Sequence, residues 1–241
     1  MIPVAEIFGP TIQGEGPNTG LKTLFVRVAG CDFKCSWCDS KFAWKIDQNT
    51  TRYNSRELYS ELLKRCIETN TANVVFTGGN PCLYDLGEVI GLLRDEGIGI
   101  DIETQGSILP EWLKGVDNLV ISPKAPSSGQ KDVYETLLKW FTENDITIPN
   151  VTFKIPIFND EDFEFATKYY DLMEKLTWET HTRVKVYLSV GNDNTEEQGD
   201  ISKRILMNYE RLIDKTMASD MKKVYVMPQV HTLVWGNKQG V

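Results

Sequence analysis

Hydrophobic and polar positions form two kinds of segment that alternate along most of the chain. Short apolar runs of the length of buried strands occupy residues 22–29, 73–76, 98–102, 119–122, 151–157, 184–188 and 224–227. Longer stretches, in which apolar residues recur every three or four positions, predict helices over residues 55–67, 83–95, 131–143, 160–176 and 201–216. Asn54, followed three residues later by Glu57, is expected to cap the first of these helices.

Apolar residues on two of the predicted helices indicate which faces are buried. In the first helix the expected buried face is formed by Leu58, Tyr59, Leu62, Leu63, Cys66 and Ile67. In the helix over residues 160–176 the apolar stripe is Phe163, Ala166, Tyr170 and Met173, with Tyr169 beside it. We therefore expect these aromatic residues to lie between helix and sheet.

Strands separated by helices of this length are typical of repeated βαβ units, so we predict an α/β fold with a mostly parallel sheet. The pattern alone does not distinguish a barrel from an open sheet. In both architectures the functional loops follow the C-terminal ends of the strands. Polar or glycine-rich segments stand at these places, over residues 30–40, 77–81, 103–106 and 122–124. These four segments are expected to meet on one rim of the sheet.

Length and charge narrow the possible functions. The 241 residues fit one domain over residues 1–241. With 26 basic and 34 acidic residues, the net charge is −8, which disfavours direct action on tRNA and broad binding to nucleic acid or an anionic membrane. There is no apolar run of the ~20 residues that a membrane span needs. The first residues lack the basic and apolar regions of a secretory signal, so we expect a cytoplasmic protein.

Three of the five cysteines, Cys31, Cys35 and Cys38, form a C-x3-C-x2-C motif on a predicted loop. Such a loop can bind zinc or an iron–sulfur cluster. Structural zinc needs four ligands, usually in two pairs, and the two histidines, His181 and His231, are isolated. Three thiolates satisfy three irons of a 4Fe–4S cluster and leave the fourth open to a chelating ligand. A zinc-stabilised binding module and a metal-free loop remain alternatives at this point.

The cysteine motif, with Trp37 directly before the last cysteine, resembles the signature of the radical S-adenosylmethionine (SAM) superfamily. The resemblance implies that the open iron is chelated by SAM, which one electron cleaves to a 5′-deoxyadenosyl radical. The segment 77–81, Thr-Gly-Gly-Asn-Pro, resembles the superfamily's Gly-Gly-Glu-Pro motif, with Asn80 in place of Glu. This likeness implies that the glycines approach the methionine amino group.

Further segments resemble the 7-carboxy-7-deazaguanine synthase family: residues 6–16, Arg27, Ser40, residues 103–106, 122–124 and 228–237. That resemblance implies conversion of 6-carboxy-5,6,7,8-tetrahydropterin to 7-carboxy-7-deazaguanine, with loss of ammonia and regeneration of SAM, in the biosynthesis of queuosine and other 7-deazapurines. It also implies a partial, open form of the β/α barrel, a bound Mg²⁺, a homodimer and a reductant such as flavodoxin or ferredoxin.

The resemblance also assigns residues. The cluster ligands are Cys31, Cys35 and Cys38, and the Mg²⁺ ligand is Ser40. The substrate-binding residues are Ile12, Gln13, Gly14, Glu15, Arg27, Thr77 and Val241. The cofactor-binding residues are Trp37, Cys38, Asp39, Gly79, Glu103, Gln105, Ser122, Pro123, Lys124, Ser189 and Asn192. A guanidinium such as that of Arg27 suits a substrate carboxylate because it binds both oxygens at once.

One alternative within the superfamily is an activase of glycyl-radical enzymes, which shares the cysteine motif. Residues 13–16, Arg27 and the segment 235–237 argue against it. We expect His231 to be a structural or dimer-contact residue, because the sequence offers no partner that would tune it. Cys66 and Cys82 are expected to be buried.

Overall fold

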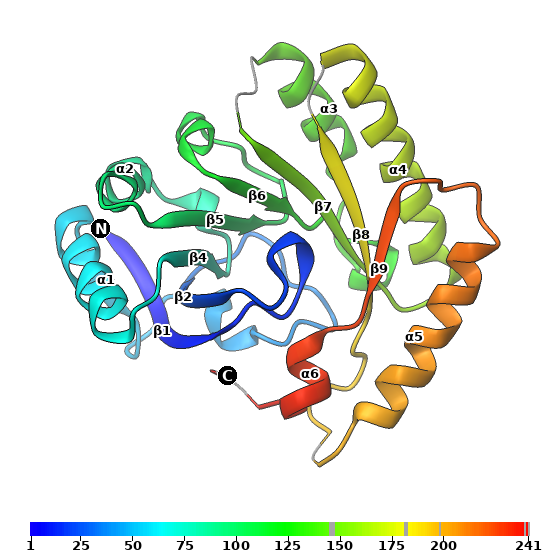
Figure 1. The fold of residues 1–241 in the computed structure, drawn as a ribbon, viewed down its shortest axis with the longest axis horizontal. Coiled ribbons are helices and arrows are strands. Elements are labelled where there is room, and N and C mark those ends of the chain that lie inside the picture. The colour runs from blue at the N-terminus through cyan, green and yellow to red at the C-terminus, as the bar shows by residue number, and fades with distance from the viewer. Residues whose placement is uncertain (145–147, 181–182, 198, 239, 241) are drawn as a thin grey trace.

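The computed structural model describes residues 1–241 except 145–147, 181–182, 198, 239 and 241. Within this described part, nine strands form one sheet in the order β3-β1-β2-β4-β5-β6-β7-β8-β9 (Figure 1). The strands are β1 Ile2–Ile12, β2 Lys22–Val28, β3 Thr51–Tyr53, β4 Asn73–Gly78, β5 Gly99–Thr104, β6 Asn118–Ile121, β7 Asn150–Ile157, β8 Val184–Val190 and β9 Val224–Met227. The helices are α1 Ser55–Thr69, α2 Gly87–Asp95, α3 Tyr134–Glu143, α4 Asp160–Thr180, α5 Ser202–Met217 and α6 Val230–Trp235.

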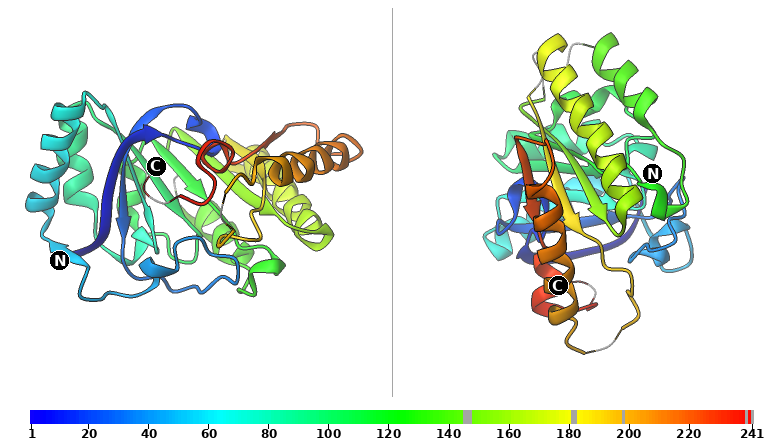
Figure 2. Two further views of the ribbon diagram at one scale, coloured as in Figure 1. Left: turned by 90° about the horizontal axis from the view of Figure 1, so that it is seen from below. Right: turned by 90° about the vertical axis from the view of Figure 1, so that its right-hand side faces the viewer.

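The sheet is parallel from β2 to β9 and curves without closing (Figures 1 and 2). Its two edges are β3 and β9, so the structure is an open form of the β/α barrel, as predicted. All seven strands and five helices predicted from the sequence are present. The prediction did not include β1, β3 and α6. β1 pairs antiparallel with both β2 and β3, so it extends the sheet without a crossover helix.

Helices α1 to α5 lie around the outer face of the sheet, whereas α6 lies at its open end (Figure 1). In β7 the ring of Phe153 points outward and meets Phe141 of α3 and Tyr169 of α4 edge to face, with centroids 6.2 and 5.5 Å apart. Phe163, Tyr169 and Tyr170 are buried, which confirms their predicted place between helix and sheet. Burying each such ring stabilises the fold by roughly 1.5–3 kcal/mol.

Helix α1 begins as predicted and buries a narrower face than predicted. Asn54 accepts a hydrogen bond from the backbone of Glu57, whose carboxylate accepts one from the backbone of Asn54, a complete capping box. Leu58, Leu62 and Cys66 are buried, but Ile67 is 72% exposed. The assignment of Ile67 to the buried face was wrong, because each residue turns the helix by about 100° and carries Ile67 away from the sheet.

Alternate residues of the strands face the inside of the curved sheet, where polar side chains gather. At the base of this space Asp101 of β5 is buried and accepts hydrogen bonds from Asn18, Asn73 and Asn118 at 2.7, 3.3 and 2.6 Å. Asn18 belongs to the loop between β1 and β2, residues 13–21, so Asp101 anchors that loop inside the fold. None of the helices in the described part of the chain is both long and apolar enough to cross a membrane.

Candidate active site

A cavity of about 300 Å³ opens at the C-terminal ends of the strands. The four segments predicted to meet on one rim all contribute to it. It is lined by these predicted site residues: Ile12, Gln13, Gly14, Glu15, Arg27, Cys31, Cys35, Trp37, Cys38, Asp39, Ser40, Thr77, Gly79, Glu103, Gln105, Ser122, Lys124, Ser189 and Asn192. Pro123 is not among the lining residues, and Val241 lies outside the described residues.

Cys31, Cys35 and Cys38 occupy one end of the cavity on the loop after β2. Nitrogen donors point at the Cys31 sulfur: the backbone N–H of Phe33 lies 3.4 Å from it, and the Gln105 amide lies 3.9 Å from it. Donors of this kind surround the sulfurs of iron–sulfur clusters and tune their potential. Burial raises the pKa of the Cys35 thiol to about 11, so a thiolate there needs a cationic centre beside it. Three thiols with such surroundings fit a 4Fe–4S cluster.

The glycine turn after β4 is needed because two backbones touch there. A Cβ on Gly79 would lie 1.9 Å from the carbonyl oxygen of Gly30, which precedes the cysteine loop. Asn80 is fully buried, donates to Asp32 at 2.9 Å and accepts from Thr104 at 2.9 Å. Asn80 therefore ties the cysteine loop to β5, which gives a structural reason for an amide where the superfamily motif has Glu.

Trp37 is held between two loops that follow neighbouring strands. Its ring stacks on Phe158 with centroids 4.8 Å apart, and its indole N–H donates to Ser127 Oγ at 3.0 Å. The ammonium of Lys124 lies 5.7 Å from the Trp37 ring and donates to Ser122 Oγ at 3.0 Å. Burial lowers the pKa of Lys124. These residues form a compact wall beside the cysteines.

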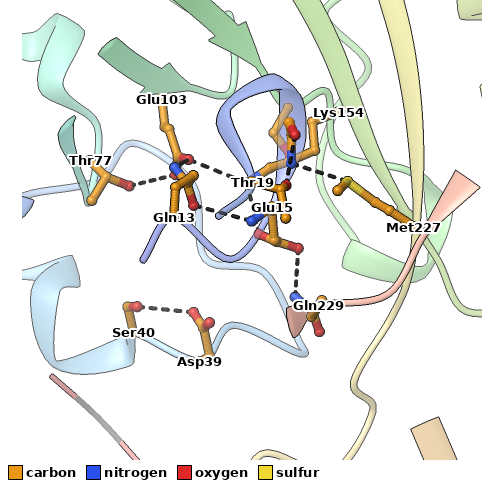
Figure 3. Close-up of polar contacts among 12 residues, drawn as sticks. Gln13, Glu15, Thr19, Asp39, Ser40, Thr77, Glu103, Lys154, Met227 and Gln229 are labelled. Carbon is orange, nitrogen blue, oxygen red and sulfur yellow. Dashed lines mark hydrogen bonds and ion pairs between the residues drawn. The ribbon is translucent and has the colours of Figure 1, made fainter. Parts of the chain in front are cut away.

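Arg27 of β2 points into the cavity and is fixed from two sides. Its Nε donates to Glu6 at 2.7 Å, and its Nη1 donates to Ser40 Oγ at 2.8 Å. Ser40 donates in turn to Asp39 at 2.9 Å (Figure 3). This arrangement places the predicted carboxylate-binding residue beside the predicted Mg²⁺ ligand.

Another part of the cavity wall carries a network of carboxylates and amides (Figure 3). Glu103 accepts from Gln13 Nε2 and Thr77 Oγ1, each at 3.0 Å. Glu15 accepts from Lys154 Nζ and from Gln229 Nε2, each at 2.8 Å. Glu103, predicted to bind the cofactor, thus lies in one network with residues predicted to bind the substrate.

Lys154, Gln229 and His231 line this wall, and the sequence analysis assigned none of them to the site. Lys154 carried a usable signal, since it is the single charge in the apolar run 151–157. His231 was expected at a structural or dimer contact. A Cβ on Gly14 would lie 2.3 Å from the His231 ring, so Gly14 is the residue that makes room for it.

Two buried oxygen atoms of the cavity wall have no hydrogen-bond partner among the described residues, Ser189 Oγ and Gln229 Oε1. A buried polar atom without a partner costs about 1–3 kcal/mol, so such atoms commonly mark places where a ligand binds. Asn192 differs from them, because its amide donates to Asn237 at 2.6 Å and accepts from Arg204 at 3.0 Å.

A family model described as the radical SAM superfamily matches residues 25–169, more than half of the chain. Together with the open β/α barrel and the cysteine loop, this match defines a radical SAM enzyme. The 7-carboxy-7-deazaguanine synthase of Bacillus subtilis is 42% identical over 250 residues, covering 100% of this chain and 98% of the relative. That of Bacillus cereus is 40% identical over 249 residues, covering 100% and 99%. The chain belongs to the 7-carboxy-7-deazaguanine synthase family.

The fold has a solved counterpart in the crystal structure of QueE from Escherichia coli. The two chains superpose with a TM-score of 0.68 at 22% identity, and the match covers 95% of this chain and 94% of the other. The predicted superfamily and fold are confirmed, and the predicted cofactor set of 4Fe–4S cluster, SAM and Mg²⁺ is that of this family. Neither the activase nor the zinc-stabilised module finds support in these relatives.

Proposed function

We propose that this chain converts 6-carboxy-5,6,7,8-tetrahydropterin into 7-carboxy-7-deazaguanine. The observation that carries the proposal is that one cavity is lined both by the three cysteines and by a network of fixed carboxylate and amide groups. When bound, the cluster and SAM supply one electron and a 5′-deoxyadenosyl radical. The chain's own residues bind and orient the substrate and keep water away.

In this proposal Cys31, Cys35 and Cys38 ligate the cluster. The other residues predicted to bind the cofactor hold SAM along the wall between the cysteine loop and β6–β8. Support comes from the close approach at Gly79, the paired Ser122 and Lys124, and the unpartnered hydroxyl of Ser189. Because Ser189 is fully buried, its hydroxyl gains a hydrogen bond only when a ligand enters.

For the substrate, we assign its carboxylate to Arg27 and its nitrogen-rich ring to Gln13, Glu15 and Thr77. Each oxygen of the Glu15 carboxylate keeps a lone pair beyond the donor it already has, and this pair is available to a ring N–H. Val241, which lies outside the described residues, is assigned to the same subsite from the family resemblance. A C-terminal affinity tag that leaves the substrate KM unchanged would remove this assignment.

Ser40 is the proposed Mg²⁺ ligand, with Asp39 beside it. Within the described ranges, no three His, Cys, Asp or Glu side chains are arranged to hold a single metal ion. Most of the Mg²⁺ shell is therefore assigned to substrate oxygens and water, which this ion readily retains.

We further propose that residues 1–241 act as one domain, that two copies form a homodimer and that a flavodoxin or ferredoxin delivers the electron. The single-domain proposal is supported by a hydrophobic core whose members come from β1, β2, β4 to β8 and α1 to α5. The cytoplasmic location stays a prediction.

An anaerobic turnover assay tests the proposed function. Reconstituted protein, SAM, Mg²⁺, a reductant and 6-carboxy-5,6,7,8-tetrahydropterin are expected to give 7-carboxy-7-deazaguanine, measured by liquid chromatography and mass spectrometry. If SAM is cleaved to 5′-deoxyadenosine and no deazaguanine forms, the proposed substrate is rejected.

A further inference from the structure

Lys154 is a buried cation between two carboxylates that come from distant parts of the chain. It stands in the middle of β7, where its neighbours Phe153 and Ile155 are buried on the outer face of the sheet. Its side chain is only 9% exposed and points inward (Figure 3). The Nζ atom lies 2.8 Å from Glu15 Oε2 and 3.6 Å from Glu103 Oε1. Burying an ammonium is costly unless such partners surround it.

Each of these two carboxylates is in turn tied to other parts of the wall. Glu103 accepts hydrogen bonds from Gln13 and Thr77. Glu15 accepts one from Gln229, which follows β9. Lys154 therefore stands at the centre of a network that joins the β1–β2 loop, β4, β5 and the segment after β9.

The charges of this network depend on one another. Burial alone would raise the pKa of Glu15, but the charge of Lys154, together with His231 and the hydrogen bonds from Lys154 and Gln229, lowers it to about 2. Burial by itself would lower the pKa of Lys154. The negative charges of Glu103 and Glu15 outweigh burial and raise this pKa above its ordinary value, with a smaller contribution from Asp39. Lys124, which is also buried, is a second cation whose charge acts on Lys154.

We propose that Lys154 is a positioning residue for substrate recognition. It holds the Glu15 carboxylate in place, 2.8 Å from its ammonium, so that the β1–β2 loop presents its acceptors to the N–H groups of the substrate ring. This inference rests on the proposed function. It adds a residue of β7 to a subsite otherwise assigned to β2, β4 and the β1–β2 loop.

The test compares Lys154→Met and Lys154→Arg with the wild type as reconstituted holoenzymes. Loss of the cation removes a charge-assisted network, so we expect the substrate KM of Lys154→Met to rise about 10- to 100-fold. We expect its kcat to stay within about threefold of the wild type. Lys154→Arg retains the charge and is expected to recover most of the affinity. Lys139→Met, at an exposed position of α3, is the matched control.

A second readout is the pH profile of kcat/KM. Without Lys154, burial dominates at Glu15 and its pKa rises, so kcat/KM of Lys154→Met is expected to fall as the pH drops between about pH 9 and 6. The profiles of wild type and Lys154→Arg are expected to lack this step. SAM cleavage to 5′-deoxyadenosine in the absence of substrate should be equal in the wild type and the Lys139→Met control.

Two outcomes decide the inference. A Lys154→Met enzyme with the KM and pH profile of the wild type overturns it, whereas absence of product from the wild type overturns the proposed function instead.

If Lys154→Met does not fold, the double variant Lys154→Met, Glu15→Gln removes one uncompensated charge and takes its place. Equal KM values for that double variant and for Glu15→Gln alone then support the inference, and a further rise in KM contradicts it.

Discussion

Asp162 lies outside the cavity but is expected to govern the shape of its cysteine end. The side chain is fully buried near the start of α4. Its two oxygens accept hydrogen bonds from the backbone N–H groups of Ser127 and Phe158, each at 3.0 Å. Ser127 receives the indole N–H of Trp37, and Phe158 stacks on the same indole. One carboxylate therefore holds both contacts of the aromatic residue inside the cysteine motif.

The two hydrogen bonds of Asp162 set the loss of stability expected for Asp162→Ala. A hydrogen bond to a charged group contributes about 1.5–3 kcal/mol, and two are lost, so the free energy of unfolding should fall by about 3–6 kcal/mol. Asp162→Asn keeps the volume and one acceptor, but it turns an NH2 group towards one of the two backbone N–H groups. Its loss is expected to be smaller than that of Asp162→Ala.

Urea unfolding of the cluster-free protein, followed by circular dichroism, measures these losses. Asp160→Ala is the control, because Asp160 is an exposed acid of the same helix whose ion pair with Lys215 should contribute less than about 1 kcal/mol. In the reconstituted enzyme, Asp162→Ala should also raise the KM for SAM more than the KM for substrate. A stability loss for Asp162→Ala no larger than that of Asp160→Ala would refute the reasoning.

Three further predictions follow from the site. Alanine at Cys31, Cys35 or Cys38 should abolish SAM cleavage, measured as 5′-deoxyadenosine, whereas Cys66→Ala should retain it because Cys66 lies in the core away from the cavity. Gly79→Ala should lose SAM binding in equilibrium dialysis, because its Cβ would overlap the Gly30 carbonyl. Glu15 has a lowered pKa of about 2 against an ordinary 4.5, so its contribution of about 3 kcal/mol is complete above pH 4.5 and is lost as the pH falls towards 2. Acid unfolding curves should therefore be less steep for Glu15→Gln than for the wild type.

The parallel part of the fold was predictable from the sequence because each of its strands is an apolar run between helices. Strand β1 was not predictable, because Pro3, Gly9 and Pro10 interrupt the alternation of apolar and polar residues that is typical of a strand. The structure tolerates them because β1 pairs with β2 through an irregular register and with β3 over only a short stretch. A pattern read along the chain cannot reveal a strand that is specified by its neighbours.

The cysteine end of the cavity was predictable because its ligands lie within eight residues of one another. The wall around Glu15 was predictable only in part: Glu15 and Glu103 were assigned from the family resemblance, but their contacts join residues far apart in the chain, such as Glu15 with Gln229. Lys154 could have been found as a lone charge in a buried strand. The sequence does not show, however, that Glu15 and Glu103 are the carboxylates that pair with it. His231 has no neighbour in sequence that indicates its place, and only the fold brings it to Gly14.

The open side of the incomplete barrel is joined by isolated contacts and not by strand pairing. Where a closed barrel would continue its ladder of paired strands, this chain has separate contacts that join the β1–β2 loop to β9 and to the segment after it. Val230 donates to Gly14 at 3.0 Å and Gly16 to the Met227 sulfur at 3.1 Å. Parting β7 from β8 would break a ladder of seven residue pairs, whereas parting this seam breaks a few isolated bonds. This side of the fold is therefore joined by fewer hydrogen bonds than the paired strands β7 and β8.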